Sequence, residues 1–197
     1  GHSVAIHKNL LVVGAIGENL GGYSSGAVYV FKNTNNKWVQ VAKLSPARPV
    51  AYGNFGYAVD VFNGIIAVGS PGYDELGGDS GAVFLFKESD GNNWQQVTML
   101  TANDGANGDN FGCCLALHHN RIIVGAYADD DAGGASGSAY VFTKSKEKWV
   151  QSMKLKAGDA KMEKYFGSSV DLDLNNAVIG AWGDDENGRE SGAAYLF

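Results

Sequence analysis

The chain repeats one short string four times. The copies are SGAVYVF (25–31), SGAVFLF (80–86), SGSAYVF (136–142) and SGAAYLF (191–197), and their last residues are 55, 56 and 55 positions apart. A fixed period of this length indicates a repeat architecture. We therefore expect any functional site where the copies differ or where they meet.

Each copy contains four short segments with strand patterns. The first follows Phe-Gly and places apolar residues at every second position, as in YAVDVF (57–62). The second is a β-branched apolar run such as IIAVGS (65–70), which is typical of a strand buried on both faces. The third is the repeated string. The fourth begins at a Trp and mixes polar with apolar residues, as in WQQVTML (94–100), which suits an outer strand.

No segment has a sustained helical pattern, so we expect an all-β fold. Four antiparallel strands per repeat predict the blade of a β-propeller. The repeats span 1–54, 55–110, 111–165 and 166–197 within one propeller domain, or propeller fragment, over 1–197. The last repeat lacks the fourth, outer strand. Because the connections alternate between short and long, one face of the disc should be plain and the other should carry long loops, where binding residues concentrate.

Composition limits the partners of the chain. A net charge of −6 and a pI of about 5.1 leave no basic face for nucleic acid. No apolar run approaches transmembrane length, so we expect no membrane insertion. The two cysteines, Cys113 and Cys114, are adjacent and give neither a disulfide framework nor a zinc spacing. No catalytic motif can be defended, so we expect no enzyme.

The pairing of Phe-Gly with a following Gly-Ala or Gly-Ser-Pro resembles the FG-GAP repeat of integrin α-subunit propellers and of many surface proteins. The matching residues are Phe55-Gly56 with Gly69-Ser70-Pro71, Phe111-Gly112 with Gly125-Ala126, Phe166-Gly167 with Gly180-Ala181, and Gly1 with Gly14-Ala15. The resemblance covers the whole chain. It implies a secreted, extracellular or cell-surface propeller used for adhesion or ligand binding. Integrin repeats often carry a calcium motif between the first two strands, of which only Asp171-Leu-Asp173-Leu-Asn175 keeps a part here.

The long loop between the second and third segments has thirteen residues from Gly to Gly in every copy and is acidic in three of them. Its acidic residues are Asp74, Glu75, Asp129, Asp130, Asp131, Asp184, Asp185 and Glu186. Clustered carboxylates can bind calcium, with Asp129, Asp131, Asp184 and Glu186 as the candidate ligands. The alternative, which we favour, is that short acidic side chains cap turns, because no loop has the complete spacing of a calcium motif.

Aromatic residues are also expected on the long-loop face. The third position of the thirteen-residue loop is Tyr127 or Trp182 in the last two copies, and Tyr52 and Tyr165 lie in the loops that precede Phe-Gly. Aromatic side chains on loops are frequent anchors of protein or glycan contacts. We predict that these four residues bind such a ligand together with Asp74, Glu75, Asp129, Asp130, Asp184 and Asp185. The alternative is that the rings cover the ends of the blade cores.

Two further carboxylates, Asp60 and Asp171, fall in the innermost strands, where the other copies have Ala5 and Ala116. Either they line a central channel and bind an ion or water there, or they accept backbone N–H bonds.

The unequal strand count leaves three arrangements open. The last blade is three-stranded in a four-bladed disc, the chain is part of a longer parent propeller, or two chains build one ring as a homo-oligomer. The alternative to a ligand-binding function is therefore a structural module that completes a ring with other chains or further repeats.

Overall fold

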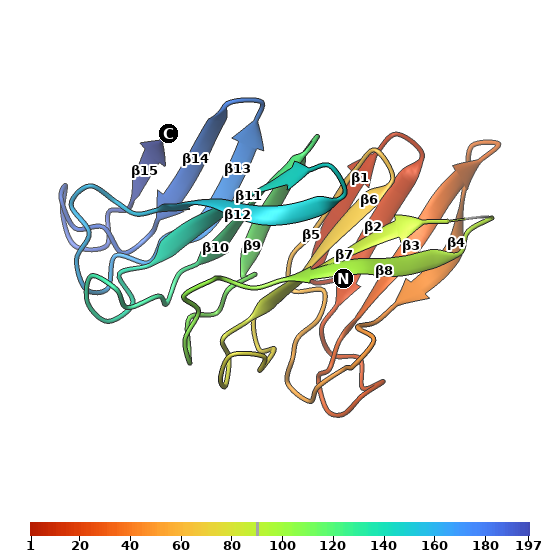
Figure 1. Ribbon diagram of the computed structural model, residues 1–197, viewed down its shortest axis with the longest axis horizontal. Helices are drawn as coiled ribbons and strands as arrows, with labels where there is room; N and C mark the ends of the chain where they lie inside the picture. The colour runs from red at the N-terminus through yellow and green to blue at the C-terminus, as the bar shows by residue number, and fades with distance from the viewer. Residues whose placement is uncertain (90) are drawn as a thin grey trace.

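The computed structural model describes residues 1–89 and 91–197, and these residues form fifteen β-strands in four antiparallel sheets. The all-β prediction is confirmed, as is the division into three four-stranded sheets and a final three-stranded one. We call the sheets blades 1 to 4. They follow one another in chain order across the molecule (Figure 1).

The blades have the following strands. Blade 1 contains β1 (Ser3–His7), β2 (Leu10–Ala15), β3 (Ala27–Thr34) and β4 (Lys37–Leu44). Blade 2 contains β5 (Val59–Phe62), β6 (Ile65–Ser70), β7 (Ala82–Glu88) and β8 (Trp94–Leu100). Blade 3 contains β9 (Cys114–His118), β10 (Arg121–Ala126), β11 (Ser138–Ser145) and β12 (Lys148–Leu155). Blade 4 contains β13 (Phe166–Asp173), β14 (Asn176–Ala181) and β15 (Ala193–Leu196).

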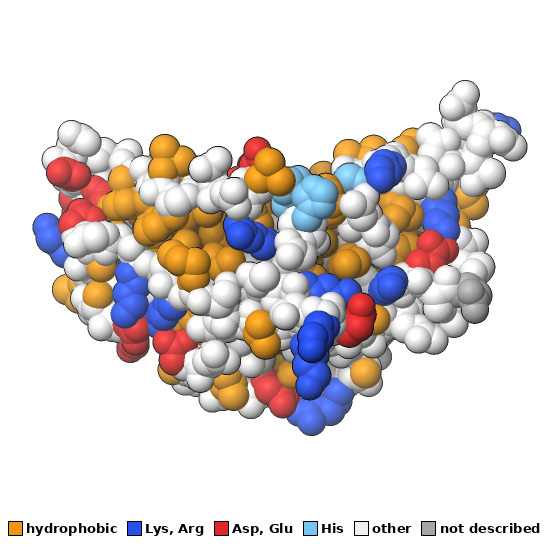
Figure 2. Space-filling model, turned by 45° about the horizontal axis from the view of Figure 1, so that its top comes forward, with side chains coloured by type: hydrophobic (Ala, Val, Ile, Leu, Met, Phe, Trp, Pro, Cys, Tyr) orange, Lys and Arg blue, Asp and Glu red, His pale blue; other side chains and the backbone are white. Residues whose placement is uncertain are grey.

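The first strands of neighbouring blades contact one another, β1 with β5, β5 with β9 and β9 with β13, so they form the inner edge of the row. This is the strand order of propeller blades. The described residues form an open row, however, and do not close into a ring (Figure 1). Figure 2 shows a crescent with histidine side chains gathered at its hollow edge.

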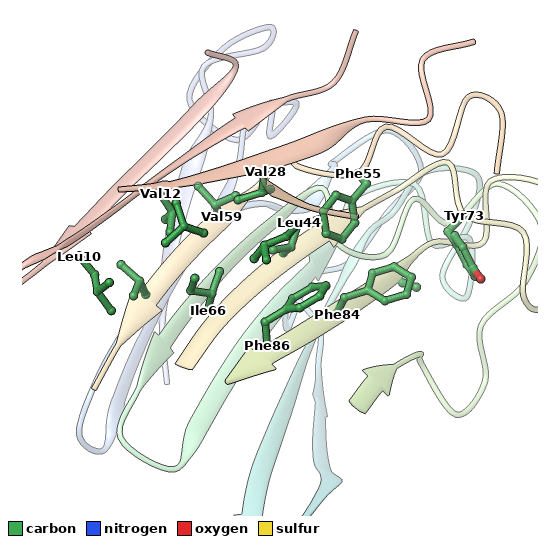
Figure 3. Close-up of a cluster of buried hydrophobic side chains, with 14 residues drawn as sticks. Leu10, Val12, Val28, Leu44, Phe55, Val59, Ile66, Tyr73, Phe84 and Phe86 are labelled. Atoms are coloured by element: carbon green, nitrogen blue, oxygen red, sulfur yellow. The ribbon is translucent and has the colours of Figure 1, made fainter. Parts of the chain in front are cut away.

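The hydrophobic cores lie between blades. Each blade turns one sheet face toward the next blade, which we call its forward face, and one toward the preceding blade, its rear face. In the first core, Val12, Val28 and Val30 of blade 1 pack against Val59 and other residues of blade 2 (Figure 3). The alternating and continuous apolar patterns thus produce two-sided sheets whose faces are covered by neighbours.

The repeated motifs meet at these junctions. Gly26 of the first SG string forms a parallel bridge with Phe55 of the next Phe-Gly, and the Phe55 amide donates to the carbonyl of Ser25 at 3.1 Å. A Cβ placed on Gly26 would lie 2.1 Å from the Phe55 carbonyl oxygen, and the φ of Gly26 is 84°. Only glycine fits such a position. The same bridge joins Gly81 to Phe111 and Gly137 to Phe166.

Candidate ligand-binding face

The thirteen-residue loops share one backbone conformation. In each of them the amide of the closing glycine donates to the carbonyl of the fifth loop residue, at 2.8–2.9 Å, and the preceding serine hydroxyl donates to the same carbonyl. The closing residues are Ser25-Gly26, Ser80-Gly81, Ser136-Gly137 and Ser191-Gly192. Because these backbone hydrogen bonds are the same in all four loops, the loops differ from one another in their side chains.

Three of the four predicted aromatic residues come together on this face. Tyr165, in the loop between β12 and β13, stacks on Trp182, in the β14–β15 loop, with ring centroids 4.2 Å apart and planes 7° from parallel. The ring centroid of Tyr127, in the β10–β11 loop, lies 6.2 Å from that of Tyr165. Trp182 is 53% exposed. We call Tyr127, Tyr165 and Trp182 the aromatic platform.

Tyr165 has a backbone conformation that is unfavourable for a bulky residue. Its φ is 54°, and the equivalent positions in the other repeats hold Asn54 and Asn110, with φ of 53° and 58°. Asparagine tolerates this left-handed region, whereas other residues incur a cost of about 1–3 kcal/mol. A tyrosine in this strained conformation is the kind of local conflict that accompanies functional sites.

The fourth predicted aromatic residue lies elsewhere. Tyr52 contacts Tyr23, with ring centroids 5.5 Å apart, and both side chains are exposed beside blade 1. The sequence analysis missed Tyr23. Its signal was present, because the equivalent loop position is Gly78, Gly134 or Arg189 in the other repeats.

A small pocket adjoins the platform. It has a volume of about 220 Å³, and its lining includes Tyr165, Trp182, Asp185, Arg189 and Glu190. The Asp185 carboxylate accepts the Glu190 amide at 2.5 Å, which fixes one wall of the pocket. Two aromatic rings and charged side chains of both signs therefore line the same pocket.

The acidic residues of the repeat-three loop lie against lysine. The Lys154 ammonium, from β12, donates to Asp129 at 2.9 Å, to Asp131 at 2.7 Å and to Asp104 at 2.7 Å, and Tyr140 also donates to Asp129 at 2.7 Å. We call these five residues the repeat-three polar cluster. Hydrogen bonds from Lys154 and from Lys156 lower the pKa of Asp131 to about 2.

Repeat four has an equivalent cluster built from a different lysine. Asp184 accepts hydrogen bonds from Lys164 at 2.6 Å and from Tyr195 at 2.9 Å, and Lys164 also contacts Asp159. These four residues form the repeat-four polar cluster. Lys164 comes from the β12–β13 loop, whereas Lys154 comes from the fourth strand of its blade; the described residues of blade 4 form three strands. The hydrogen bond from Lys164 lowers the pKa of Asp184 to about 2, whereas burial and the bond to Asp184 raise the pKa of Tyr195 to about 12.

The positions held by Asp129, Tyr140 and Lys154 in repeat three vary together among the repeats. Repeat one has Glu18, Tyr29 and Lys43 there, with a Lys43 to Glu18 distance of 3.0 Å in a more exposed setting. In repeat two the same positions hold Tyr73, Phe84 and Met99, which are apolar except for the Tyr73 hydroxyl, and that hydroxyl donates to the Arg48 carbonyl at 3.2 Å. The acid, the tyrosine and the lysine are therefore present together or replaced together.

These contacts place the predicted acidic residues in two groups. Asp129 and Asp184 are buried beneath the loops. Asp74 accepts the backbone amide of Asp79 and Asp185 accepts that of Glu190, which agrees with the turn-capping interpretation. The second group is exposed and consists of Asp74, Glu75, Asp130, Asp131, Asp185 and Glu186. Calcium binding stays a prediction, and at Asp129, Asp131 or Asp184 it requires displacement of a lysine. In the described residues, no group of three or more His, Cys, Asp and Glu is arranged to hold a metal ion.

Asp60 joins two blades at the inner edge. One carboxylate oxygen accepts the amide of Val61 and the other accepts the amide of Leu117 in blade 3, both at 2.7 Å. Burial raises the pKa of Asp60, and the nearby charge of Asp171 adds to the rise. Asp171 accepts the amide of Leu172 at 2.8 Å in the same way, but it lies on the uncovered side of blade 4.

Four successive antiparallel blades, joined by backbone bridges between the SG and Phe-Gly motifs, define an all-β repeat protein. The family model described as FG-GAP repeat matches residues 1–31, 38–86, 94–142 and 149–197, so the chain belongs to the FG-GAP repeat family. A comparison with curated proteins finds no match. The residues described in the structure include no helix long and apolar enough to span a bilayer.

Proposed function

We propose that this chain is a non-catalytic, extracellular ligand-binding module of the propeller type, and that its long-loop face binds a glycan at the aromatic platform. The stacked pair of Tyr165 and Trp182 is the observation that carries the proposal. Family membership supports it, because FG-GAP repeat proteins are generally non-catalytic and are typically extracellular.

The chemistry of the platform favours a sugar. An exposed indole face stacks on the apolar face of a pyranose, while carboxylate and guanidinium groups at its edge bind hydroxyl groups. Here the indole of Trp182 is half exposed, and Asp185, Arg189 and Glu190 line the pocket beside it. Tyr165 holds the indole in place from the other side, so little side-chain entropy is lost on binding.

The proposal is tested by screening the protein on a glycan array and then measuring the affinity of a hit by calorimetry. Trp182→Ala removes an interface anchor, which typically costs about 2 kcal/mol or roughly 30-fold in affinity. Trp182→Phe keeps an aromatic face and should retain most of the binding.

The matched control is Tyr52→Ala, which removes an exposed aromatic ring from the same face but outside the platform. Its affinity should equal that of the unmodified protein. Failure of the unmodified protein to bind any glycan, or equal binding by Trp182→Ala, would show that the platform does not have this function.

A further inference from the structure

A groove opens between the outer strands of blades 2 and 3, at the end of the sheets where the short turns lie. It has a volume of about 390 Å³, and its apolar lining includes Val97 of β8 with Trp149 and Val150 of β12. The two valines are 53% and 51% exposed. Val41, which is the equivalent of Val97 in blade 1, instead packs against the core of the first junction. The second junction is therefore open where the first is filled.

Lysine dominates the charge of this groove. Lys87, Lys144 and Lys148 line it together with one acid, Glu147. Lys144 pairs with Glu147 at 3.1 Å, but the Glu147 side chain is 89% exposed, so the pair is largely solvated. In the described part of the chain, neither Lys87 nor Lys148 forms an ion pair. The groove is thus positive on a chain whose net charge is −6, and a cleft lined by one sign of charge concentrates ions of the other sign.

The first junction neutralises the same two positions. The strand register places Lys87 in β7 where Lys32 lies in β3, and Lys144 in β11 where Glu88 lies in β7. Across the first junction, the Lys32 ammonium donates to the Glu88 carboxylate. Across the second junction, the corresponding residues are both lysines. A carboxylate that the first junction contains is therefore replaced by a second positive charge.

We propose that this groove binds a small organic anion, with its oxyanion group at Lys87 and Lys144 and its apolar body against Trp149 and the two valines. The oxyanion supplies the negative charge that Glu88 supplies at the first junction. The volume of the groove lies within the range of small-molecule sites, which is roughly 300–1,000 Å³. Because a lysine ammonium is a compact point charge without the planar fork of arginine, the site should select for negative charge and not for one geometry of oxyanion.

The test is a titration of isotope-labelled protein with cinnamate, an aromatic carboxylate, followed by NMR at the indole N–H signals. The Trp149 signal, assigned by its loss in Trp149→Phe, should shift and saturate at millimolar cinnamate. Affinity measured at Trp149 reports on the groove and not on the aromatic platform, which contains Trp182. The uncharged amide of cinnamate and acetate, which has no apolar body, should each bind at least about tenfold more weakly.

Lys144→Glu gives the second junction the lysine and glutamate of the first. It should weaken cinnamate binding at least about tenfold, because it removes a charge-assisted hydrogen bond and puts a carboxylate beside the oxyanion. Lys87→Gln, at an exposed position, tests the other lysine if Lys144→Glu fails to fold, which circular dichroism checks. The matched control is Lys146→Glu, which makes the same charge change in the same β11–β12 turn, at an exposed residue outside the groove.

The control should keep its affinity within about twofold at physiological ionic strength, where the Debye length is about 8 Å and a charge outside the groove is largely screened. No shift of the Trp149 signal in the unmodified protein would overturn the proposal. Equal binding by Lys144→Glu and Lys87→Gln, an equal loss in Lys146→Glu, or equal binding of the uncharged amide would overturn it as well, because the lysines would then not recognise an anion. Acetate that binds as tightly as cinnamate would overturn the role of Trp149 and the valines.

Discussion

Lys154→Met tests whether the polar clusters are coupled units. Lys154 is the shared cation of Asp104, Asp129 and Asp131, and its side chain is only 14% exposed. The substitution leaves the buried Asp129 with Tyr140 as its remaining side-chain donor. Loss of one partner of a buried ion pair typically costs 3–5 kcal/mol.

The expected loss is near the lower end of that range, about 3 kcal/mol, because Asp104 and Asp131 are partly exposed and water can solvate them. For a chain of this size, that loss lowers Tm by roughly 6–12 °C. Urea denaturation followed by circular dichroism measures the free energy of unfolding, and a thermal melt measures Tm.

Repeat two supplies the compensating change. The triple variant Asp129→Tyr, Tyr140→Phe and Lys154→Met reproduces the Tyr73, Phe84 and Met99 combination that blade 2 already packs. Replacement of a buried ionic group by well-packed apolar residues is often neutral or stabilising, and blade 2 shows that the same loop and strands accommodate the larger tyrosine, so we expect the triple variant within about 1 kcal/mol of the unmodified chain.

Repeat one supplies the control. Lys43→Met breaks the corresponding contact to Glu18, but both side chains are about one-third exposed, so water solvates Glu18 and the loss of stability should be far smaller than for Lys154→Met. If Lys154→Met costs no more than Lys43→Met, or if the triple variant is as unstable as the single one, the three positions are not a coupled unit.

Three further predictions concern the framework and its acids. Gly81→Ala brings a Cβ within 2.0 Å of the Phe111 carbonyl oxygen at a positive φ, so in urea melts it should destabilise the chain far more than Gly17→Ala, whose Cβ would meet nothing within 4 Å. The folded-state pKa of Asp184, about 2, lies below its ordinary 3.8, so its stabilisation is present above about pH 4 and is lost as pH falls through about 2. The Tm difference between the unmodified chain and Asp184→Asn should narrow over that window, and a constant difference contradicts the assignment. Calcium or a chelator should leave Tm unchanged, because lysine already lies against the buried carboxylates; a rise in Tm would reveal a site.

The strands and their order followed from the sequence because they depend on local patterns. Period-two alternation, short β-branched runs and glycines at fixed positions are encoded within a few residues of one another, and four copies reinforce each pattern. Ring closure could not be predicted in this way, since it depends on small rotations between blades that accumulate along the row.

The roles of the acidic residues depend on distant partners. Asp129 lies in a loop and Lys154 in an outer strand, 25 positions further along the chain. The loop sequence alone therefore predicted that Asp129 binds a ligand or calcium. Comparison of equivalent positions in the four repeats would have revealed the pair, because the acid, the tyrosine and the lysine are all replaced in repeat two. Lys164 was less accessible still, because it comes from a loop that has no matching lysine in the other repeats.

The repeat-four polar cluster also positions the platform. Lys164 precedes Tyr165, and Asp184 lies two residues after Trp182, so their ion pair ties together the two segments that carry the stacked rings. The amide of Gly183 donates to the Lys164 carbonyl at 3.2 Å and strengthens this link.

Lys164→Met should therefore weaken glycan binding about tenfold by loosening the supporting contacts, although the lysine is buried and does not line the pocket beside the platform. Lys154→Met belongs to the other cluster and should leave affinity unchanged at temperatures where it remains folded. Calorimetry measures both affinities, and near-UV circular dichroism reports the environment of Trp182. If the two variants bind equally well, the ion pair stabilises blade 4 without positioning its aromatic rings.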